Sequence, residues 1–219
     1  MMQQGWYAAL HALAGGRIRH ELREDPRVPE RPGGLWFHMA SVGEVHGMVP
    51  FIRHFRKAYS GPLWCSATTR TGLARLQESL QDLPEVEIFR FPLDHPPYLV
   101  DIFARHPRAL ALIETELWPG LLQGVREHRI PLLILNGRMR HRTYQLYRWI
   151  PPIRSALSEV RRAYVQTQWD AYRFAMLGIP RNRIRVTGNW KMLFPHRHPQ
   201  PLSREDLKLP EDVPVVVLA

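Results

Sequence analysis

Three acidic residues in this sequence have the surroundings that acid–base chemistry requires. Glu44 ends the run S-V-G-E at residues 41–44, and Glu114 and Glu116 stand two positions apart in E-T-E-L-W-P at residues 114–119. Both runs directly follow short apolar segments of the length of a strand. A carboxylate held beside a substrate hydroxyl can remove its proton as a general base. The two runs are therefore the first candidates for an active site.

Glu44 can be interpreted in two ways. Gly43 would let the backbone turn tightly, and Glu44 would then lie in the first turn of a helix. The helix dipole favours a carboxylate there by about 0.3–1 kcal/mol, which predicts a poised, ionised base. Alternatively, Glu44 is an ordinary first-turn glutamate and Ser41 is the helix cap.

Glu114 and Glu116 stand two positions apart after a strand, and we expect them to point to opposite sides. At least one of them would then lie beside the buried sheet, where carboxylates are rarely left unpaired. Arg138 or Lys191, from the ends of neighbouring strands, could supply the counter-charge. The alternative is one capping acid and one surface acid.

Further polar residues follow other predicted strands. Thr69, Thr71 and Gly72 offer hydroxyls and amides at a helix start, which suits an anion but is equally typical of capping. The remaining strand-end candidates are Asp94, Asn136 and Asn189. The sequence has no glycine-rich nucleotide loop, no D-x-D pair and no zinc-like spacing, so we expect neither a metal site nor a cofactor.

The elements that must position these residues alternate regularly. Short apolar runs, read as strands, lie at 35–40, 62–67, 86–91, 109–113, 131–135, 161–166 and 184–187. Between them, apolar residues recur at helical spacing, as in Leu117, Leu121 and Val125, and again in Leu146, Ile150 and Ile153. This alternation predicts a doubly wound, Rossmann-like α/β domain with a parallel sheet over residues 34–191. Ligands bind at the carboxyl ends of such strands, so we expect the polar residues to meet at one crevice.

Composition narrows the class of protein and of partner. The 219 residues are 45% hydrophobic and 23% charged, which excludes collagen, coiled-coil and disordered chains. The single cysteine, Cys65, excludes a disulfide framework. The formal net charge is +10 and all but three of the 30 Lys and Arg residues are arginine, which suits phosphate or carboxylate groups on a partner. Seven arginines are spread between residues 138 and 162, with aromatic residues among them, and this segment could bind nucleic acid or anionic lipid headgroups.

The two ends of the chain differ from its middle. Residues 1–33 hold a short apolar stretch at 6–14, far below the ~20 residues that span a bilayer, followed by basic residues and a linker. A short helix of this kind can lie on a membrane surface, or simply dock on the domain. Residues 192–213 are proline-rich and are predicted to be an interdomain linker. Residues 214–219 are predicted to be the first strand of a truncated second domain, which makes the chain the N-terminal half of a longer protein.

In unbroken order over residues 34–194, the sequence resembles the lipid A 3-deoxy-D-manno-octulosonic acid (Kdo) transferases of Gram-negative bacteria. The motifs that carry the resemblance are S-V-G-E at 41–44, T-x-T-G at 69–72, P-x-D at 92–94, E-T-E-L-W-P at 114–119, N-x-R at 136–138 and G-N-x-K at 188–191. The resemblance implies the N-terminal half of a two-domain GT-B glycosyltransferase. In that architecture the N-terminal domain binds the lipid A precursor as acceptor, and the other domain binds the donor CMP-Kdo.

The resemblance also implies roles for residues. Glu44 matches the proposed general base, and Glu114 and Lys191 match groups that support the transition state. The other polar motif residues are then expected to contact substrate: Ser41, Gly43, Thr69, Thr71, Gly72, Asp94, Glu116, Asn136, Arg138 and Asn189. The implied location is the cytoplasmic face of the inner membrane, attached peripherally to its anionic surface, with no nucleic acid partner.

Two alternatives stay open at this point. The chain could belong to a GT-B transferase that uses another sugar nucleotide, or it could be a basic anion-binding module without activity. If the first interpretation holds, the chain alone is expected to be inactive, since a GT-B active site lies between its two domains.

Overall fold

The computed structural model describes residues 28–92, 94 and 96–193, and this part forms a parallel sheet of seven strands. The strands are β1 (Leu35–Met39), β2 (Leu63–Ala67), β3 (Val86–Arg90), β4 (Ala109–Ile113), β5 (Leu132–Gly137), β6 (Arg162–Val165) and β7 (Ile184–Val186). They coincide with the seven apolar runs, and every pairing between neighbours is parallel. The predicted doubly wound α/β fold is therefore confirmed.

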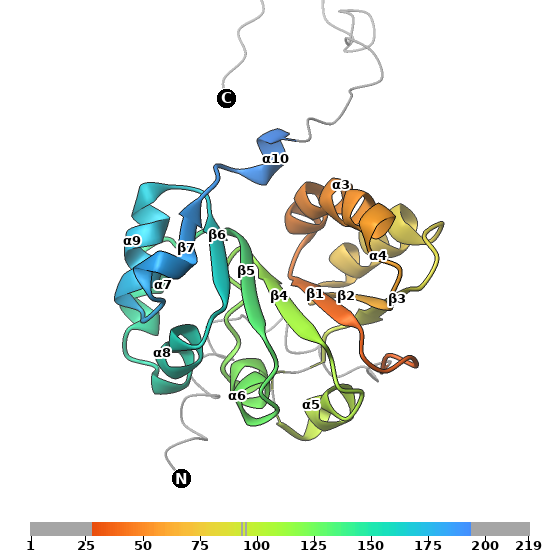
Figure 1. The fold of residues 1–219 in the computed structure, drawn as a ribbon, viewed down its shortest axis with the longest axis horizontal. Helices are drawn as coiled ribbons and strands as arrows, with labels where there is room; N and C mark the ends of the chain where they lie inside the picture. The colour runs from red at the N-terminus through yellow and green to blue at the C-terminus, as the bar shows by residue number, and fades with distance from the viewer. Residues whose placement is uncertain (1–27, 93, 95, 194–219) are drawn as a thin grey trace, which may run out of the picture.

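The helices follow the strands in the order expected for βαβ units. They are α3 (Val42–Ala58), α4 (Arg70–Leu80), α5 (Pro96–Phe103), α6 (Pro119–Glu127), α7 (His141–Tyr147), α8 (Pro151–Ser158), α9 (Gln168–Met176) and α10 (Trp190–Leu193), with a 3₁₀ helix η1 (Arg181–Arg183) before β7. In Figure 1, α3 and α4 lie on one side of the sheet, and α5, α6 and α8 lie on the other.

Each face of the sheet has its own core, because successive strand residues point to opposite sides. Trp36 packs on the face that α5, α6 and α8 cover, in one cluster with residues such as Leu121 and Ile153. Its neighbour Phe37 packs on the other face with Met48 and other residues of α3 and α4. Strands buried on both faces explain the near-continuous apolar runs in the sequence.

The strand order places the first and fourth strands side by side. The sheet runs β3-β2-β1-β4-β5-β6-β7, so the chain winds outward in one direction from β1 and then in the other from β4 (Figure 1). The carboxyl ends of β1 and β4 form the point where the winding direction changes, which is where open α/β sheets bind ligands. Glu44 follows β1 and Glu114 follows β4.

One predicted helix is wrong. The spacing of Leu146, Ile150 and Ile153 predicts a single helix, but α7 ends at Tyr147 and α8 begins at Pro151. Two consecutive prolines cause the break, because a proline cannot donate to the preceding turn and disfavours helical backbone in the residue before it. Ile150 is accordingly extended, and Leu146 is 37% exposed and belongs to no buried face.

The predictions for residues 1–27 and 194–219 lie outside the described residues, and the proposed domain boundaries there stay predictions. Within the described part of the chain, none of the helices has the length and apolar character needed to cross a bilayer.

Candidate functional site

Glu44 is the third residue of α3, and its carboxylate turns back towards the end of β1. The backbone N–H of Ala40 donates to Glu44 Oε2 at 2.6 Å, and the Ser41 hydroxyl donates to Glu44 Oε1 at 3.4 Å. Ser41 occupies the N-cap position of α3 but makes no capping hydrogen bond with its side chain. The capping interpretation is therefore wrong for Ser41, whose hydroxyl serves the glutamate instead.

Burial decides the proton affinity of Glu44. Desolvation raises the pKa of Glu44 to about 7, against the lowering effect of the Ala40 hydrogen bond; Glu114 raises it further, and Lys191 and Ser41 lower it. The sequence predicted an ionised carboxylate from the helix dipole alone. The dipole is not what decides the pKa of Glu44, because at a site removed from water the desolvation cost exceeds the roughly 0.3–1 kcal/mol that a dipole contributes.

Glu114 and Glu116 both lie beside Glu44, so the expectation that they point to opposite sides is wrong; residues two positions apart along a strand share a face. Glu114 has a φ of +56°, which is rare for a residue with a long side chain, and it ends the strand geometry at Ile113. The Glu114 side chain is 12% exposed and forms an ion pair with Lys191, with Nζ and Oε1 2.7 Å apart. Lys191, and not Arg138, thus supplies the counter-charge.

Glu116 is buried to a similar extent, with its side chain 13% exposed. Its Oε2 accepts a hydrogen bond from the indole N–H of Trp118 at 2.7 Å. Desolvation, followed by the charge of Glu44, raises the pKa of Glu116 to about 8, and the Trp118 hydrogen bond lowers it in part. Glu44, Glu114 and Glu116 therefore act on one another and are called the carboxylate cluster below.

The helix α10 delivers Lys191 to this cluster. The Lys191 N–H donates to the Asn189 side chain at 3.1 Å, and the Trp190 N–H donates to Asn136 Oδ1 at 3.0 Å. The Trp190 ring packs against Phe51 of α3, with centroids 5.0 Å apart. The ends of β5 and β7 and the helix α3 thus hold Trp190 and Lys191 beside the carboxylate cluster, from which they are distant in the sequence.

Two glycines of α3 face this lysine unequally. A Cβ at Gly43 would meet only Lys191 Nζ, at an ordinary 3.9 Å, and Gly43 lies within the helix, so the tight turn predicted there is not present. A Cβ at Gly47 would lie 2.5 Å from Lys191 Cγ. Gly47, which sequence reasoning missed, is the position that lets Lys191 reach Glu114.

Asn136 connects the strands around Glu114. Like Glu114 it has a positive φ, +53°, a conformation that asparagine tolerates better than other residues. Its Nδ2 donates to Glu114 Oε1 at 3.5 Å, while its Oδ1 accepts from the backbone of Trp190. Asn136 is buried, and in this structure its side chain joins β5, Glu114 and α10.

The turn before α4 has the capping role that the sequence left open. Thr69 Oγ1 accepts from the Gly72 N–H at 3.1 Å and donates to the Ala40 carbonyl at 3.0 Å, which links this turn to the residue that binds Glu44. Gly72 is buried, and Thr71 is exposed with its hydroxyl 3.5 Å from that of Thr69.

The hydrogen bonds of Asp94 and Arg138 are made to residues outside the carboxylate cluster. Asp94 is 2% exposed, and its two carboxylate oxygens accept from the N–H groups of Gly120 and Leu121 at the start of α6. Desolvation raises the pKa of Asp94 to about 6, against these two hydrogen bonds. Arg138 is exposed, and its carbonyl accepts from the Thr115 hydroxyl. The contacts of Asp94 are those of a helix cap.

Sequence reasoning also missed a buried histidine behind the cluster. His38 of β1 is fully buried, with Nδ1 2.9 Å from Ser66 Oγ and Nε2 3.8 Å from Glu116 Oε2. Burial lowers the pKa of His38 to about 3, so the ring is neutral. The available signal was a histidine inside an otherwise apolar strand, L-W-F-H-M.

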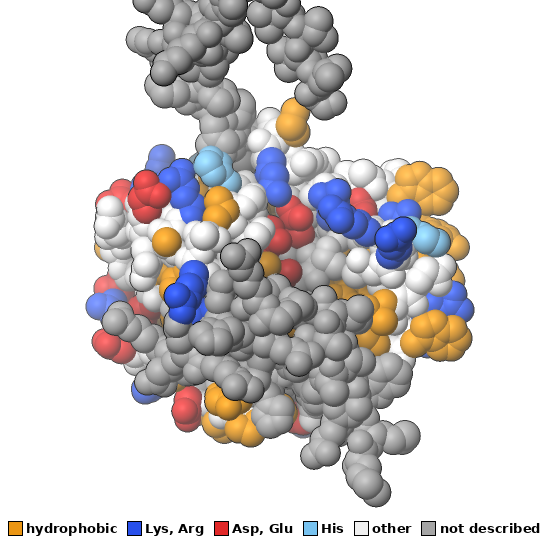
Figure 2. Space-filling model, turned by 180° about the vertical axis from the view of Figure 1, so that it is seen from behind, with side chains coloured by type: hydrophobic (Ala, Val, Ile, Leu, Met, Phe, Trp, Pro, Cys, Tyr) orange, Lys and Arg blue, Asp and Glu red, His pale blue; other side chains and the backbone are white. Residues whose placement is uncertain are grey.

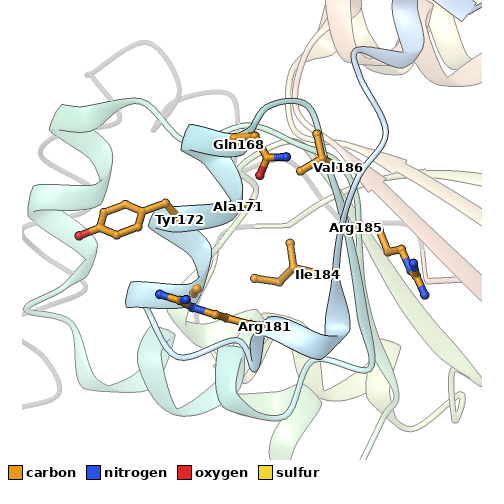
Figure 3. A pocket seen from close by; sticks show the side chains of 8 residues that line it. Gln168, Ala171, Tyr172, Arg181, Ile184, Arg185 and Val186 are labelled. Atoms are coloured by element: carbon orange, nitrogen blue, oxygen red, sulfur yellow. The ribbon is translucent and has the colours of Figure 1, made fainter.

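Two further features bear on what the site could hold. Among the described residues, no group of three or more His, Cys, Asp and Glu is arranged to hold a metal ion. A separate hollow of about 560 Å³ lies between α9 and β7, where Tyr172 and Arg181 flank Ile184 (Figure 3). None of its lining residues belongs to the carboxylate cluster.

The surface around the site is mixed in charge. Figure 2 shows acidic side chains set back between Lys and Arg side chains on one face of the molecule. The arginines between 138 and 162 are exposed but do not form one patch: Arg138 and Arg140 follow the carboxyl end of β5, whereas Arg161 and Arg162 lie at the amino end of β6. The first pair is therefore at the same edge of the sheet as the carboxylate cluster.

Comparison with known proteins gives one family. A family model described as 3-deoxy-D-manno-octulosonic-acid transferase (kdotransferase) matches residues 14–194. The 3-deoxy-D-manno-octulosonic acid transferase of Haemophilus influenzae is 30% identical over 164 residues, 73% of this chain and 38% of that protein. The bifunctional glycosyltransferase/methyltransferase of Fusobacterium nucleatum is 28% identical over 159 residues, 72% of this chain and 25% of that protein. The chain spans less than half the length of either relative.

A solved structure shares the fold. The UDP-GlcNAc 2-epimerase from Neisseria meningitidis bound to UDP-GlcNAc superposes with a TM-score of 0.50 and 16% identity, over 72% of this chain and 47% of that chain. At this identity the likeness concerns the fold alone.

Proposed function

Because this chain belongs to the 3-deoxy-D-manno-octulosonic-acid transferase family, we propose that it forms the acceptor-binding part of a glycosyltransferase. The full reaction moves Kdo from CMP-Kdo to a hydroxyl of a lipid A precursor. The observation that carries the proposal is the meeting of Glu44, Glu114 and Lys191 where the carboxyl ends of β1 and β4 adjoin. The donor would bind mainly to residues outside the described part of the chain.

Glu44 is proposed as the general base. The acceptor hydroxyl must lose its proton as its oxygen attacks the anomeric carbon of Kdo, and a positioned carboxylate contributes about 10²–10⁴-fold to such a step. A pKa of about 7 suits this task, because a base is most effective when its pKa lies near the working pH. Ala40 and Ser41 hold the two carboxylate oxygens, which supports a fixed direction for proton transfer.

Lys191 and Glu114 are proposed to act as a pair. The Lys191 side chain is 35% exposed, which supports a role in which it faces a ligand while it remains bound to Glu114. A cation there would offset charge that develops on the departing CMP phosphate or on the Kdo carboxylate. Asn136 and Asn189 are proposed to position this pair, and Thr69 and Gly72 to fix the turn behind Glu44.

The basic surface is proposed to meet an anionic membrane. Arg138, Arg140 and Arg142 are exposed beside the edge that carries the carboxylate cluster, which places positive charge where phosphate groups of a lipid acceptor would approach. A peripheral position at the cytoplasmic face of the inner membrane would bring this edge to its lipid substrate.

The test is the transfer reaction in the intact gene product that carries this chain. Glu44→Gln keeps the size of the side chain and one acceptor oxygen, which can still bind the Ala40 N–H, but it cannot accept a proton, so we expect transfer from CMP-Kdo to fall by about 10²–10⁴-fold with donor binding unchanged. Glu78→Gln is the matched control, because Glu78 is exposed on α4 and pairs only locally, with Arg75.

The same assay can contradict the proposal in two ways. Near-normal transfer by Glu44→Gln would remove Glu44 from the role of base. Transfer from another sugar nucleotide, with none from CMP-Kdo, would leave the enzyme class in place and replace the donor.

A further inference from the structure

A chain of buried polar groups leads from the core to the carboxylate cluster. The Trp36 indole N–H donates to Ser66 Oγ at 2.7 Å, and the same oxygen lies 2.9 Å from His38 Nδ1. On the far side of the ring, His38 Nε2 points at Glu116 Oε2, 3.8 Å away. Within the described part of the chain, His38 Nε2 has no hydrogen-bond partner. A buried ring nitrogen without a partner is costly, so its direction towards Glu116 calls for a physical reason.

The cluster itself contains more negative charge than its contacts balance. Glu114 has Lys191 as its direct partner, whereas Glu44 and Glu116 repel each other and Glu114 in a site with little water. Burial and this repulsion raise the pKa of both Glu44 and Glu116, so the two carboxyl groups compete for a proton near neutral pH.

The surroundings of the two remaining carboxyl groups are unequal. Glu44 accepts hydrogen bonds from Ala40 and from Ser41, and Lys191 also acts on it, all of which favour its ionised form. Glu116 accepts one hydrogen bond, from Trp118, and faces neutral His38. Glu116 also acts on Tyr147, whose pKa is raised by burial and then by Glu116 and Asp94.

We propose that His38 is a positioning residue that holds Glu116 beside Glu44, so that Glu116 carries the shared proton and Glu44 stays ionised. Ser66 and Trp36 fix the plane of the His38 ring, and the ring limits where the Glu116 carboxyl group can move. The location of the proton follows from these contacts alone. Its use in catalysis, by keeping Glu44 ready to accept a proton, rests on the proposed function.

Two substitutions at His38 distinguish the contacts of its two ring nitrogens. The amide of His38→Gln reaches the position of Nε2 and can still face Glu116, whereas the shorter amide of His38→Asn reaches only the position of Nδ1 and faces Ser66. Both amides are neutral at every pH, and His38 is neutral above its pKa of about 3, which covers the range in which the carboxyl groups titrate. A purely structural role for the ring predicts the same outcome for both.

The measurement is a pH titration of this chain with ¹³C-labelled glutamate, followed by NMR. The signals are assigned from Glu44→Gln and Glu116→Gln. In the wild-type chain we expect Glu44 to ionise first as the pH rises, and Glu116 last. We expect His38→Gln to keep this order, and His38→Asn to move the midpoint of Glu116 by at least about one pH unit, which is a tenfold change in proton affinity.

The imidazole ¹⁵N signals of wild-type His38 provide a second measurement that needs no variant at this position. We expect the Nε2 shift to follow the midpoint of Glu116. The proposal is overturned if Glu44 is the last of the pair to ionise, if the Nε2 shift stays constant while Glu116 titrates, or if His38→Asn titrates like the wild type. No substrate is present, so these outcomes are independent of whether Glu44→Gln loses transfer activity.

Discussion

At the scale of single residues, burial determines what the acidic side chains can do. Glu44, Glu116 and Asp94 are all partly or fully removed from water, and in each case desolvation is the largest cause of a raised pKa. Folding therefore raises the proton affinity of each of these carboxyl groups above its value in the unfolded chain. For Glu44 and Glu116 the contribution to stability is complete below about pH 4.5 and is lost as the pH rises through their pKa values of about 7 and about 8.

This linkage gives a prediction for Glu116→Gln, which removes the titration and keeps the shape. Between about pH 5 and about pH 8, the free energy of unfolding of the wild type should fall more than that of the variant, by at least ~1 kcal/mol, the equivalent of about one pKa unit. For His38 the pH dependence of stability has the opposite sign, because its pKa is lowered from 6.5 to about 3. Its contribution to stability is lost only as the pH falls through that range. Urea unfolding at several pH values measures the difference, and Glu78→Gln is the control. Parallel plots of unfolding free energy against pH for Glu116→Gln and the wild type would contradict the prediction.

At the scale of elements, the site depends on how closely α10 approaches α3. Lys191 passes over Gly47, and Trp190 packs on Phe51. A methyl group at Gly47 would meet the Lys191 side chain, which is flexible and can move away, so the helix can form while the ion pair with Glu114 is displaced.

We therefore expect Gly47→Ala to lower transfer at least about tenfold, the equivalent of ~1.4 kcal/mol in the barrier, without loss of folding. Gly43→Ala is the matched control, because it makes the same change in the same helix and leaves the lysine in place. Alanine in a helix is favoured over glycine by about 0.5–1 kcal/mol, so neither variant should be destabilised by propensity. Equal activity of the two variants, or a crystal structure of Gly47→Ala with Lys191 still on Glu114, would contradict this account.

At the scale of the whole molecule, the positive charge is divided between the two edges of the sheet. Arg140 and Arg142 lie at the carboxyl edge, beside the carboxylate cluster, and Arg161 and Arg162 lie at the amino edge. A membrane that carries the acceptor would meet only the first of these edges. Trp149 follows α7 and is 65% exposed. The guanidinium carbon of Arg148 lies 4.6 Å from the centroid of its ring.

Binding to vesicles tests this division. We expect the double variant Arg140→Gln/Arg142→Gln to lose about 2 kcal/mol of affinity for phosphatidylglycerol vesicles, roughly thirtyfold, at about 1 kcal/mol for each charge. Arg161→Gln/Arg162→Gln removes the same charge from the other edge and should bind almost as the wild type does. Binding should weaken as salt is raised. Equal losses in both variants would contradict an oriented surface, and equal affinity for duplex DNA would favour a basic binding module.

The sequence by itself determined the seven strands, their parallel arrangement and the polar residues at their ends, because hydrophobic periodicity and chain order are local properties. It also placed Glu44 and Glu114 at one edge, since both follow strands of a parallel sheet, whereas the adjacency of β1 and β4 came from the structure. Only the tertiary structure decided that Glu114 and Glu116 both lie beside Glu44, because a left-handed backbone at Glu114 ends the strand there and strand periodicity does not set the course of the chain beyond it. It also decided the ion pair of Lys191, the helix cap formed by Asp94 and the proton affinity of Glu44. Each of these depends on atoms brought together from distant segments and on how much water they exclude, and neither quantity is encoded in any single stretch of the chain.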